Sequence, residues 1–264
     1  MNSNPLVSII MPAYNTQEYI KEAIESVINQ TYTNWELLIV DDLSTDVTVE
    51  IVNKMLHNDG RIKLINRQKN SGRPSIAKNS ALPYTKGKYI AFLDSDDAWL
   101  EKKLEIQIAF MQKNQNYVLT YTGGYLIDHK GVIFNSFLPK YSNGKNLKNM
   151  LTRYEINNQS VVIKSDELFT TVENFNEEII IGEDYNMFMH ILAKYEIGSI
   201  NQHLIKYRIH NKGITKSSKR VSDGVLMTLK ELNNLHSIKR KYVIGYMLSY
   251  MKAIRFKYLN KNWK

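Results

Sequence analysis

Four short runs of apolar residues, rich in branched side chains, recur in the first 93 residues and constrain the fold most strongly. They occupy residues 6–12, 35–40, 61–66 and 88–93, and their length and composition predict buried strands. Between them, apolar residues repeat at helical spacing in residues 20–28, 51–56 and 75–82. Strands that alternate with helices in units of roughly 25 to 30 residues predict right-handed crossovers, and therefore an α/β fold with a mostly parallel, Rossmann-like sheet and helices on both faces.

Polar or aromatic residues follow each of these strands. Tyr14 follows the first, residues 41–42 (Asp-Asp) end the second, the turn 70–73 follows the third, and residues 94–97 (Asp-Ser-Asp-Asp) follow the fourth. In a parallel sheet, ligands bind beyond the carboxyl ends of the strands. We therefore expect these four loops to meet along one edge of the sheet.

The fourth loop places three carboxylates, Asp94, Asp96 and Asp97, within four positions. Carboxylates so close together repel one another, and a hard divalent cation with oxygen ligands relieves that repulsion. The alternative is that Asp97 caps the next helix while the other two face water. The motif alone does not separate these interpretations, but the expected convergence of four loops favours a metal site.

The second half of the chain has a different pattern. Strands are predicted for residues 117–127, 132–137, 160–164 and 203–210, a polar loop for 135–146, and helices around 106–110 and from Glu183 onward. The helix dipole alone favours Glu183 and Asp184 at a helix start. A turn at 211–213 and two helices close the chain. We divide it into residues 1–212, with halves 1–97 and 98–212, and a helical tail, 213–264.

The tail carries the positive charge of the chain. The sequence holds 35 Lys and Arg against 26 Asp and Glu, a net charge of +9. Residues 237–264 contain eight basic and no acidic residues, which leaves 27 basic against 26 acidic, a net of +1, in residues 1–236. Interleaved aromatic residues make this pattern typical of a helix packed on the core or of one lying on an anionic membrane. One helical face would carry Val243, Met247, Met251, Ile254 and Tyr258.

The absence of cysteine excludes disulfides and thiolate metal sites and is compatible with the cytoplasm. No window is long enough to span a bilayer, and the N-terminus lacks the pattern of a secretory signal. We therefore expect a cytoplasmic protein that lies peripherally on the inner face of the cell membrane.

With these loops placed, the sequence resembles the family 2 glycosyltransferases, which have the GT-A fold and transfer sugars with inversion. The likeness extends from about residue 6 to residue 210. The matching segments are 7–15 (VSIIMPAYN), 26–32 (SVINQTY), 36–42 (ELLIVDD) with Ser44 and Asp46, 70–72 (NSG), 77–79 (AKN), 87–97 (GKYIAFLDSDD), 182–184 (GED) and 207–210 (YRIH).

The resemblance implies a UDP-sugar donor. In the family, a tyrosine of the first loop lies against the uracil and an aspartate of the second loop hydrogen-bonds it; here these are Tyr14 and Asp42. An aromatic face stacks on a base, and a carboxylate accepts the N3 proton of uracil. The implied nucleotide-sugar site consists of Pro12, Tyr14, Asn15, Asp42, Arg73, Lys78, Asp94, Ser95 and Arg208.

The resemblance also implies Mn²⁺ or Mg²⁺ on Asp96, with Asp94 and His210 as further ligands, because a divalent ion offsets the charge that develops on a diphosphate leaving group. Asp184 matches the general base that takes the proton of the acceptor hydroxyl. Glu183 would support it or bind the acceptor. The DxDD form is similar to that of bacterial O-antigen enzymes that add a hexose to lipid-linked GlcNAc, which points Asp97 toward the acceptor, although helix capping explains this residue equally well.

The implied reaction moves glucose, galactose or GlcNAc onto an acceptor sugar, expected on an undecaprenyl-diphosphate-linked glycan in O-antigen or capsule assembly. The QxxRW motif of processive synthases is absent, which favours a single addition. A sugar nucleotidyltransferase is the first alternative, but residues 6–15 contain no glycine for its phosphate loop. A non-catalytic nucleotide-sugar or nucleic-acid binder is the second; intact aspartates argue against the former, and we do not expect nucleic acid as a partner. A homodimer is left open.

Overall fold

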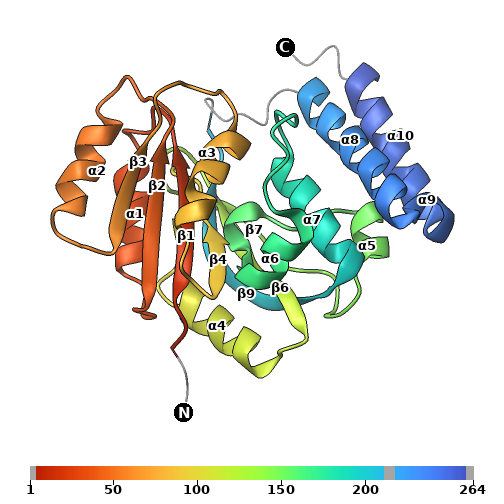
Figure 1. The fold of residues 1–264 in the computed structure, drawn as a ribbon, viewed down its shortest axis with the longest axis horizontal. Coiled ribbons are helices and arrows are strands. Elements are labelled where there is room, and N and C mark those ends of the chain that lie inside the picture. Colours follow the sequence, from red (N-terminus) through yellow and green to blue (C-terminus); the bar gives the residue numbers. More distant parts are fainter. Residues whose placement is uncertain (1–3, 211–217, 260–264) are drawn as a thin grey trace.

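The computed structural model describes residues 4–210 and 218–259, which form one curled sheet with helices on both faces and a helical unit at one side (Figure 1). The first half is built from β1 (Val7–Ala13), β2 (Trp35–Asp41), β3 (Ile62–Asn66) and β4 (Tyr89–Phe92). These strands are parallel in the order β3-β2-β1-β4. The four strands and the parallel arrangement agree with the prediction from the sequence.

The helices of this half lie on opposite faces because successive strand residues point to opposite sides. Side chains of α1 (Ile20–Ile28) and α2 (Thr48–Leu56) pack with Ile9 and Met11 in one buried cluster. Residues of α3 (Pro74–Ala81), which continues into the short 3₁₀ helix η1 (Leu82–Tyr84), pack with Ile10 in another. Both clusters include residues of the second half, so the two halves share their cores.

Beyond β4 the sheet becomes mixed. It continues through β8 (Val162–Lys164), β6 (Tyr117–Ile127), β9 (Glu196–Arg208) and β5 (Ala98–Trp99), with β7 (Ile133–Phe137) paired to β6. The long β6 and β9 are parallel, whereas β8, β5 and β7 run antiparallel to their neighbours. The remaining helices here are α4 (Lys103–Lys113), α5 (Leu147–Thr152), η2 (Asn158–Ser160), α6 (Ser165–Val172) and α7 (Glu183–Lys194).

Several of these elements differ from the prediction. The strand expected at 203–210 begins at Glu196, and β5, α5, η2 and α6 were not anticipated. The strand expected at 132–137 is present as β7, so the polar loop expected at 135–146 begins only after Phe137. Each unanticipated element has at most eight residues, which is too short for a periodic pattern to stand out. The turn predicted at 211–213 lies outside the described residues.

The C-terminal helices are α8 (Ser218–His236), α9 (Ile238–Lys241) and α10 (Val243–Leu259). Leu229, Leu232 and Ile238 are fully buried in the same cluster as Phe188 of α7. In α8, a Cβ on Gly224 would lie 2.3 Å from the carbonyl oxygen of Ile181. The first part of the tail therefore completes the core, and α10 forms the outer layer against α8 and α5.

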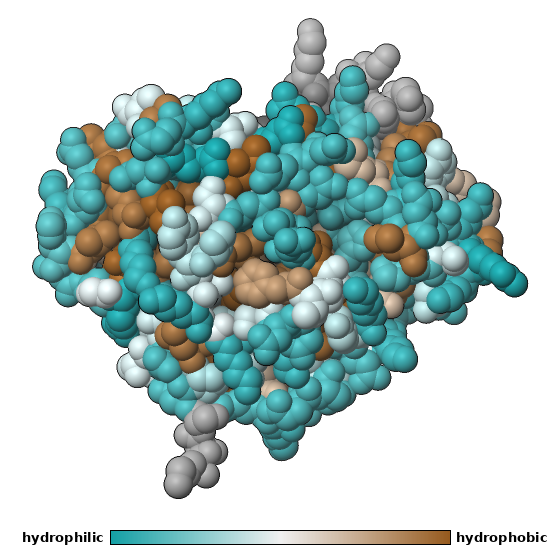
Figure 2. Space-filling view, in the orientation of Figure 1, coloured by the Kyte–Doolittle hydropathy of each residue, from teal (hydrophilic) through white to brown (hydrophobic). Residues whose placement is uncertain are grey.

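Most of the surface seen in the same orientation is polar (Figure 2). Within the described part of the chain, no helix combines the length and apolar character needed to cross a bilayer.

We predict that Gly224→Ala destabilises the protein. Alanine favours a helix by about 1 kcal/mol over glycine, but the close contact with the Ile181 carbonyl forces α8 away from the loop, and overpacking of this kind costs about 1–3 kcal/mol. Urea unfolding measures the net loss. Gly60→Ala is the control, because an added Cβ there meets no atom within 4 Å; its effect should stay within about 0.5 kcal/mol. A Gly224→Ala protein as stable as the parent would contradict the close approach.

Candidate active site

The loops after β1 and β2 are bound to each other at the carboxyl edge of the sheet. The backbone N–H of Asn15 donates to Ser44 Oγ (2.9 Å), and Asn15 Oδ1 accepts from the Thr45 N–H (2.8 Å). Asn15 and Leu43 have positive φ angles of 50° and 67°, a backbone strain that concentrates at functional sites. Beside them, Tyr14 is 48% exposed; its contact with the uracil stays a prediction.

Pro12 lies in β1 beyond Ile10, which forms the last pair with β4. Since proline lacks an N–H, this is a position where it costs no ladder bond to β4. The end of β1 therefore stays paired with β2 through Pro12 and Ala13 but no longer with β4.

Asp42 organises the third loop. Its carboxylate accepts hydrogen bonds from the Ser71 N–H (3.0 Å), the Ser71 hydroxyl (2.8 Å) and the Gly72 N–H (3.3 Å), and Arg67 Nε lies 2.8 Å from it. Only 5% of the residue is exposed. Its contact with a base remains a prediction, because in this structure its oxygens already hold the 70–73 turn. Arg73, which follows, donates to the carbonyl of Glu177 in the second half.

The three aspartates after β4 have three different environments. Asp94 accepts hydrogen bonds from the side-chain amides of Asn158 and Gln159. Asp96 is partly exposed, and its Oδ2 lies 2.8 Å from Nε2 of His210. Asp97 is buried and accepts the Arg208 N–H (2.6 Å). The structure therefore places Asp96 next to His210, the two residues predicted to share a metal ion. The Asp97 carboxylate is buried, and this environment does not favour the acceptor contact predicted for it.

Arg208 braces this loop from the end of β9. Its Nε donates to the Asp96 carbonyl (2.8 Å), its Nη1 to the Asp128 carbonyl (3.2 Å), and its Nη2 pairs with Glu22 of α1. The residue is 5% exposed. These contacts make Arg208 a positioning residue. To reach the diphosphate, as predicted, its guanidinium would have to break some of these hydrogen bonds. Ser95, also predicted to bind the donor, is buried as well.

Across the edge, α7 begins with the predicted acidic pair. Gly182 adopts a left-handed conformation (φ 94°) before the helix. Glu183 is buried and accepts a hydrogen bond from Lys78 Nζ of α3 at 2.9 Å. Asp184 is more open: its Oδ1 accepts the N–H of Tyr185 (2.7 Å), and within residues 4–210 and 218–259 it forms no ion pair. Of the two acids, Asp184 is thus the one available to a substrate.

The electrostatics of this edge are dominated by carboxylates. Burial raises the pKa of Asp94 to about 7; Asp96, Glu183 and Asp184 add to the rise, and Lys78 opposes it. Burial and the neighbouring Glu183 also raise the pKa of Asp184. For Lys78, the lowering effect of burial is outweighed by Glu183, Asp94 and Asp184, which raise its pKa and keep it charged. Lys78 is the counter-ion of three carboxylates at this edge, and an excess of acidic groups over basic ones suits a bound cation.

A divalent metal fits this donor set only together with a substrate. Among the described residues, no group of three His, Asp or Glu side chains is arranged to hold an ion alone. Asp96 and His210 are adjacent, however, and Asp94 is close to Asp96. Mg²⁺ in particular is commonly bound by one or two carboxylates plus substrate phosphates. These residues therefore suit an ion that arrives with a diphosphate.

Sequence reasoning gave no role to three residues that shape the site. Asn158 and Gln159 hold Asp94, and Asn79 accepts the Phe175 N–H (2.9 Å) and donates to the Phe175 carbonyl (3.0 Å). Asn79 belongs to a segment matched to the family, but its partner is 96 residues away. A non-local partner of this kind leaves no signal in the sequence.

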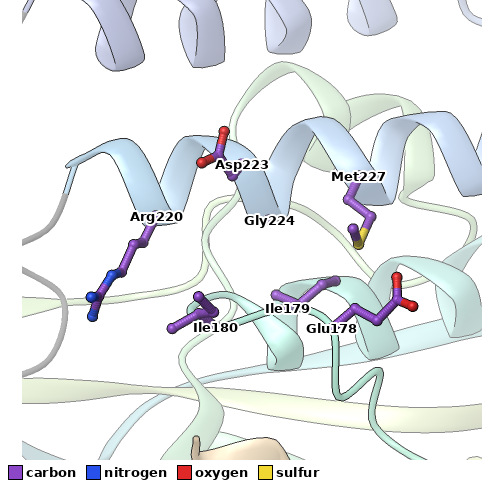
Figure 3. A pocket seen from close by; sticks show the side chains of 7 residues that line it. All are labelled: Glu178, Ile179, Ile180, Arg220, Asp223, Gly224 and Met227. Atoms are coloured by element: carbon purple, nitrogen blue, oxygen red, sulfur yellow. The ribbon is translucent and has the colours of Figure 1, made fainter. Parts of the chain in front are cut away.

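A separate cavity of about 220 Å³ lies between α8 and the loop that precedes α7 (Figure 3). Met227 points toward Ile179 across it, whereas Asp223 points away from the loop. None of the predicted site residues lines it. The full lining is Glu178, Ile179, Ile180, Arg220, Asp223, Gly224 and Met227.

We predict that Lys78→Met destabilises the fold, because it leaves Glu183 buried without its counter-ion, which costs about 3–5 kcal/mol. The free energy of unfolding in urea measures the loss. Lys21→Met is the matched control: Lys21 pairs with Glu25 at 3.7 Å but is 69% exposed, so the change should be below about 0.5 kcal/mol. If both substitutions lowered the free energy of unfolding equally, the buried pair would not stabilise the fold more than the exposed pair does.

Comparison with known proteins gives a consistent result. The family model described as Glycosyl transferase family 2 matches residues 8–165. The chain is 38% identical over 258 residues to the UDP-Glc:alpha-D-GlcNAc-diphosphoundecaprenol beta-1,3-glucosyltransferase WfgD of Escherichia coli, covering 97% of both chains. It is 32% identical over 242 residues to the putative teichuronic acid biosynthesis glycosyltransferase TuaG of Bacillus subtilis, covering 90% of this chain and 92% of TuaG.

Solved structures share the fold. TarS 1-349 of S. aureus in complex with UDP-GlcNAc superposes with a TM-score of 0.75 at 20% identity, over 97% of this chain and 74% of that one. The mannosyltransferase PcManGT of Pyrobaculum calidifontis, in complex with GDP-Man and Mn²⁺, gives a TM-score of 0.70 at 14% identity, again over 97% and 74%. The architecture is therefore the GT-A fold predicted from the sequence.

Proposed function

Because the chain belongs to glycosyl transferase family 2, we propose that this glycosyltransferase moves a hexose from a UDP-sugar to a hydroxyl group of an acceptor sugar, with inversion at the anomeric carbon. The observation that carries the proposal is the approach of acidic groups from the two halves. Asp94 and Asp96 end β4, Asp184 begins α7, and Lys78 is close enough to interact with Asp94 and Asp184.

In the proposed reaction, Asp184 is the general base. It takes the proton of the acceptor hydroxyl while that oxygen attacks the anomeric carbon, and the bond from that carbon to the diphosphate oxygen breaks on the opposite face. One carbon–oxygen bond forms and one breaks, so a single displacement inverts the centre. Glu183 is paired with Lys78. We propose that Glu183 supports the general base, because it directly precedes Asp184 at the start of α7.

On the donor side, Asp96, His210 and Asp94 would hold Mn²⁺ or Mg²⁺, which supplies positive charge to the departing diphosphate. Tyr14 stacks on the uracil, and Asp42 orders the loop beneath it. Asn15, Pro12, Ser95 and Arg208 contribute by fixing the loops, and Arg73 remains a proposed contact to the nucleotide.

The relatives support a finer assignment. WfgD is named for UDP-Glc and an undecaprenol diphosphate-linked GlcNAc, and TuaG for teichuronic acid biosynthesis. We therefore propose a role in the assembly of a cell-surface polysaccharide such as O-antigen or capsule, with a lipid-linked glycan as acceptor and glucose, galactose or GlcNAc as the transferred sugar.

We predict that Asp184→Asn lowers kcat by about 10²–10⁴-fold, because the general base is lost, and that Asp96→Ala abolishes turnover that depends on Mn²⁺. The rate of UDP release from the UDP-sugar, in the presence of a GlcNAc-diphosphate-lipid acceptor, measures the turnover of both variants. Asp166→Asn is the control, since Asp166 lies in the first turn of α6 as Asp184 does in α7, and it should leave turnover unchanged. Normal activity of the Asp184→Asn or Asp96→Ala enzyme would refute the proposed function.

We also propose that α10 binds the cytoplasmic face of an anionic membrane. Its inner side holds the core through Ser249, which donates to the Leu151 carbonyl, and the buried Ala253. Its outer side exposes five apolar residues, and basic residues of α9 lie exposed beside it. The apolar set is Val243, Ile244, Met247, Tyr250 and Met251, and the basic set is Lys239, Arg240 and Lys241. Apolar area together with basic charge is the combination that favours an anionic bilayer surface.

The double substitution Ile244→Glu with Met247→Glu should reduce sedimentation with vesicles that contain phosphatidylglycerol, because it removes apolar area and adds negative charge. Turnover of a soluble acceptor should be unchanged. Tyr84→Glu is the control, since Tyr84 is 58% exposed but lies in η1. Unchanged partitioning of the α10 variant, with the control also unchanged, would show that α10 is only a packing helix.

A further inference from the structure

Two neutral side chains of η2 hold the Asp94 carboxylate. Asn158 Nδ2 donates to Asp94 Oδ1 at 3.3 Å, and Gln159 Nε2 donates to Asp94 Oδ2. Asn158 is 5% exposed and Gln159 2% exposed. Both oxygens of this aspartate are therefore oriented from the protein side, by residues that belong to neither the donor set nor the catalytic pair.

The turn that carries these amides is itself fixed by its neighbours. Trp99 Nε1 of β5 donates to the Gln159 carbonyl (2.9 Å), and Gln107 Nε2 of α4 donates to the Ser160 carbonyl (2.9 Å). The Gln159 N–H donates to Asn157 Oδ1 (3.1 Å). Because these supports come from separate elements, the backbone of the turn that carries the Gln159 side chain is fixed by the protein itself.

The choice of amides has a chemical consequence. An amide N–H orients a carboxylate without adding charge, whereas a lysine or arginine would neutralise it and compete with a cation. Each carboxylate oxygen has about two acceptor sites, and the two amides use one on each oxygen. In addition, Asn158 Oδ1 is buried and accepts no hydrogen bond from the described residues.

We propose that Asn158 and Gln159 are positioning residues for the nucleotide-sugar donor: they fix the Asp94 carboxylate in the orientation that receives the donor and its cation, and they bring no charge of their own. The inference rests on the proposed function, since it takes Asp94 as part of the donor site. It predicts a defect in donor binding and none in acceptor binding.

The test compares Gln159→Met and Asn158→Leu with the parent enzyme. Each substitution keeps the approximate size of the side chain and removes one N–H donor to a charged group, so the Kd of UDP in the presence of Mn²⁺ should rise about tenfold. Isothermal titration measures this without turnover. In kinetics, the KM for the UDP-sugar should rise similarly while the KM for the acceptor stays within about twofold, a split that a general loss of structure would not produce.

Gln30→Met is the matched control. Gln30 is 4% exposed and donates to the backbone carbonyls of Ser26 (2.9 Å) and Leu100 (2.8 Å) instead of to a carboxylate. It should lower the free energy of unfolding and leave the Kd of UDP unchanged. Asp94→Asn is the reference: if UDP and Mn²⁺ bind to it as to the parent, the proposed function of the site fails.

If Asp94→Asn weakens binding while folded Gln159→Met and Asn158→Leu bind UDP like the parent, the positioning role alone is overturned. If neither variant folds, Trp99→Phe replaces them: it keeps an aromatic ring in this buried position and removes the N–H that holds the Gln159 carbonyl. A rise of about threefold in the Kd of UDP is then expected, and an unchanged Kd overturns the proposal.

Discussion

The buried ion pair between Lys78 and Glu183 is the interaction on which the site depends. It joins α3 of the first half to α7 of the second, at 2.9 Å, and both side chains are almost inaccessible to water. An uncompensated lysine would lose its charge on burial, but the surrounding carboxylates hold the pKa of Lys78 up. The same charge interacts with Asp94 and Asp184 and offsets their mutual repulsion, so one cation links the two acids to which we assign donor binding and base catalysis.

Much of the fold and part of the site could be predicted because their determinants are local. The second strand, expected at 35–40, is Trp35–Asp41, and the first, expected at 6–12, is Val7–Ala13. Once the crossovers are parallel, Tyr14 and Asp96 must lie at one edge. What the sequence did not reveal depends on distant partners. Asp97 is buried because the backbone of Arg208, 111 residues away, donates to it, and no local pattern distinguishes that environment from an open one.

The C-terminal helices show the same limit. The sequence marked residues 213–264 as one helical tail, but packing divides it. Gly224 and Leu232 belong to an inner helix that abuts the loop before α7, whereas Ile244 and Met247 lie on an outer helix with an exposed apolar face. Composition alone does not distinguish a helix that supports the core from one that presents a surface.

The acidic segment after β4 also has a mechanical consequence. It connects β4 to β5, and in the sheet these strands are separated by β8, β6 and β9. Four strand spacings in a flat sheet would amount to about 19 Å, close to the reach of about 20–22 Å for the six-residue step from Phe92 to Ala98 if it were fully extended. The segment turns instead, with the Asp97 N–H bonded to the Asp94 carbonyl (3.1 Å). The sheet must therefore curl, so that β4 and β5 come closer together than they would in a flat sheet and the short segment can connect them. The segment that carries the aspartates thus has two requirements to meet. It has to place their carboxylates around the ion that they would share, and it has to connect β4 to β5 across the curled sheet.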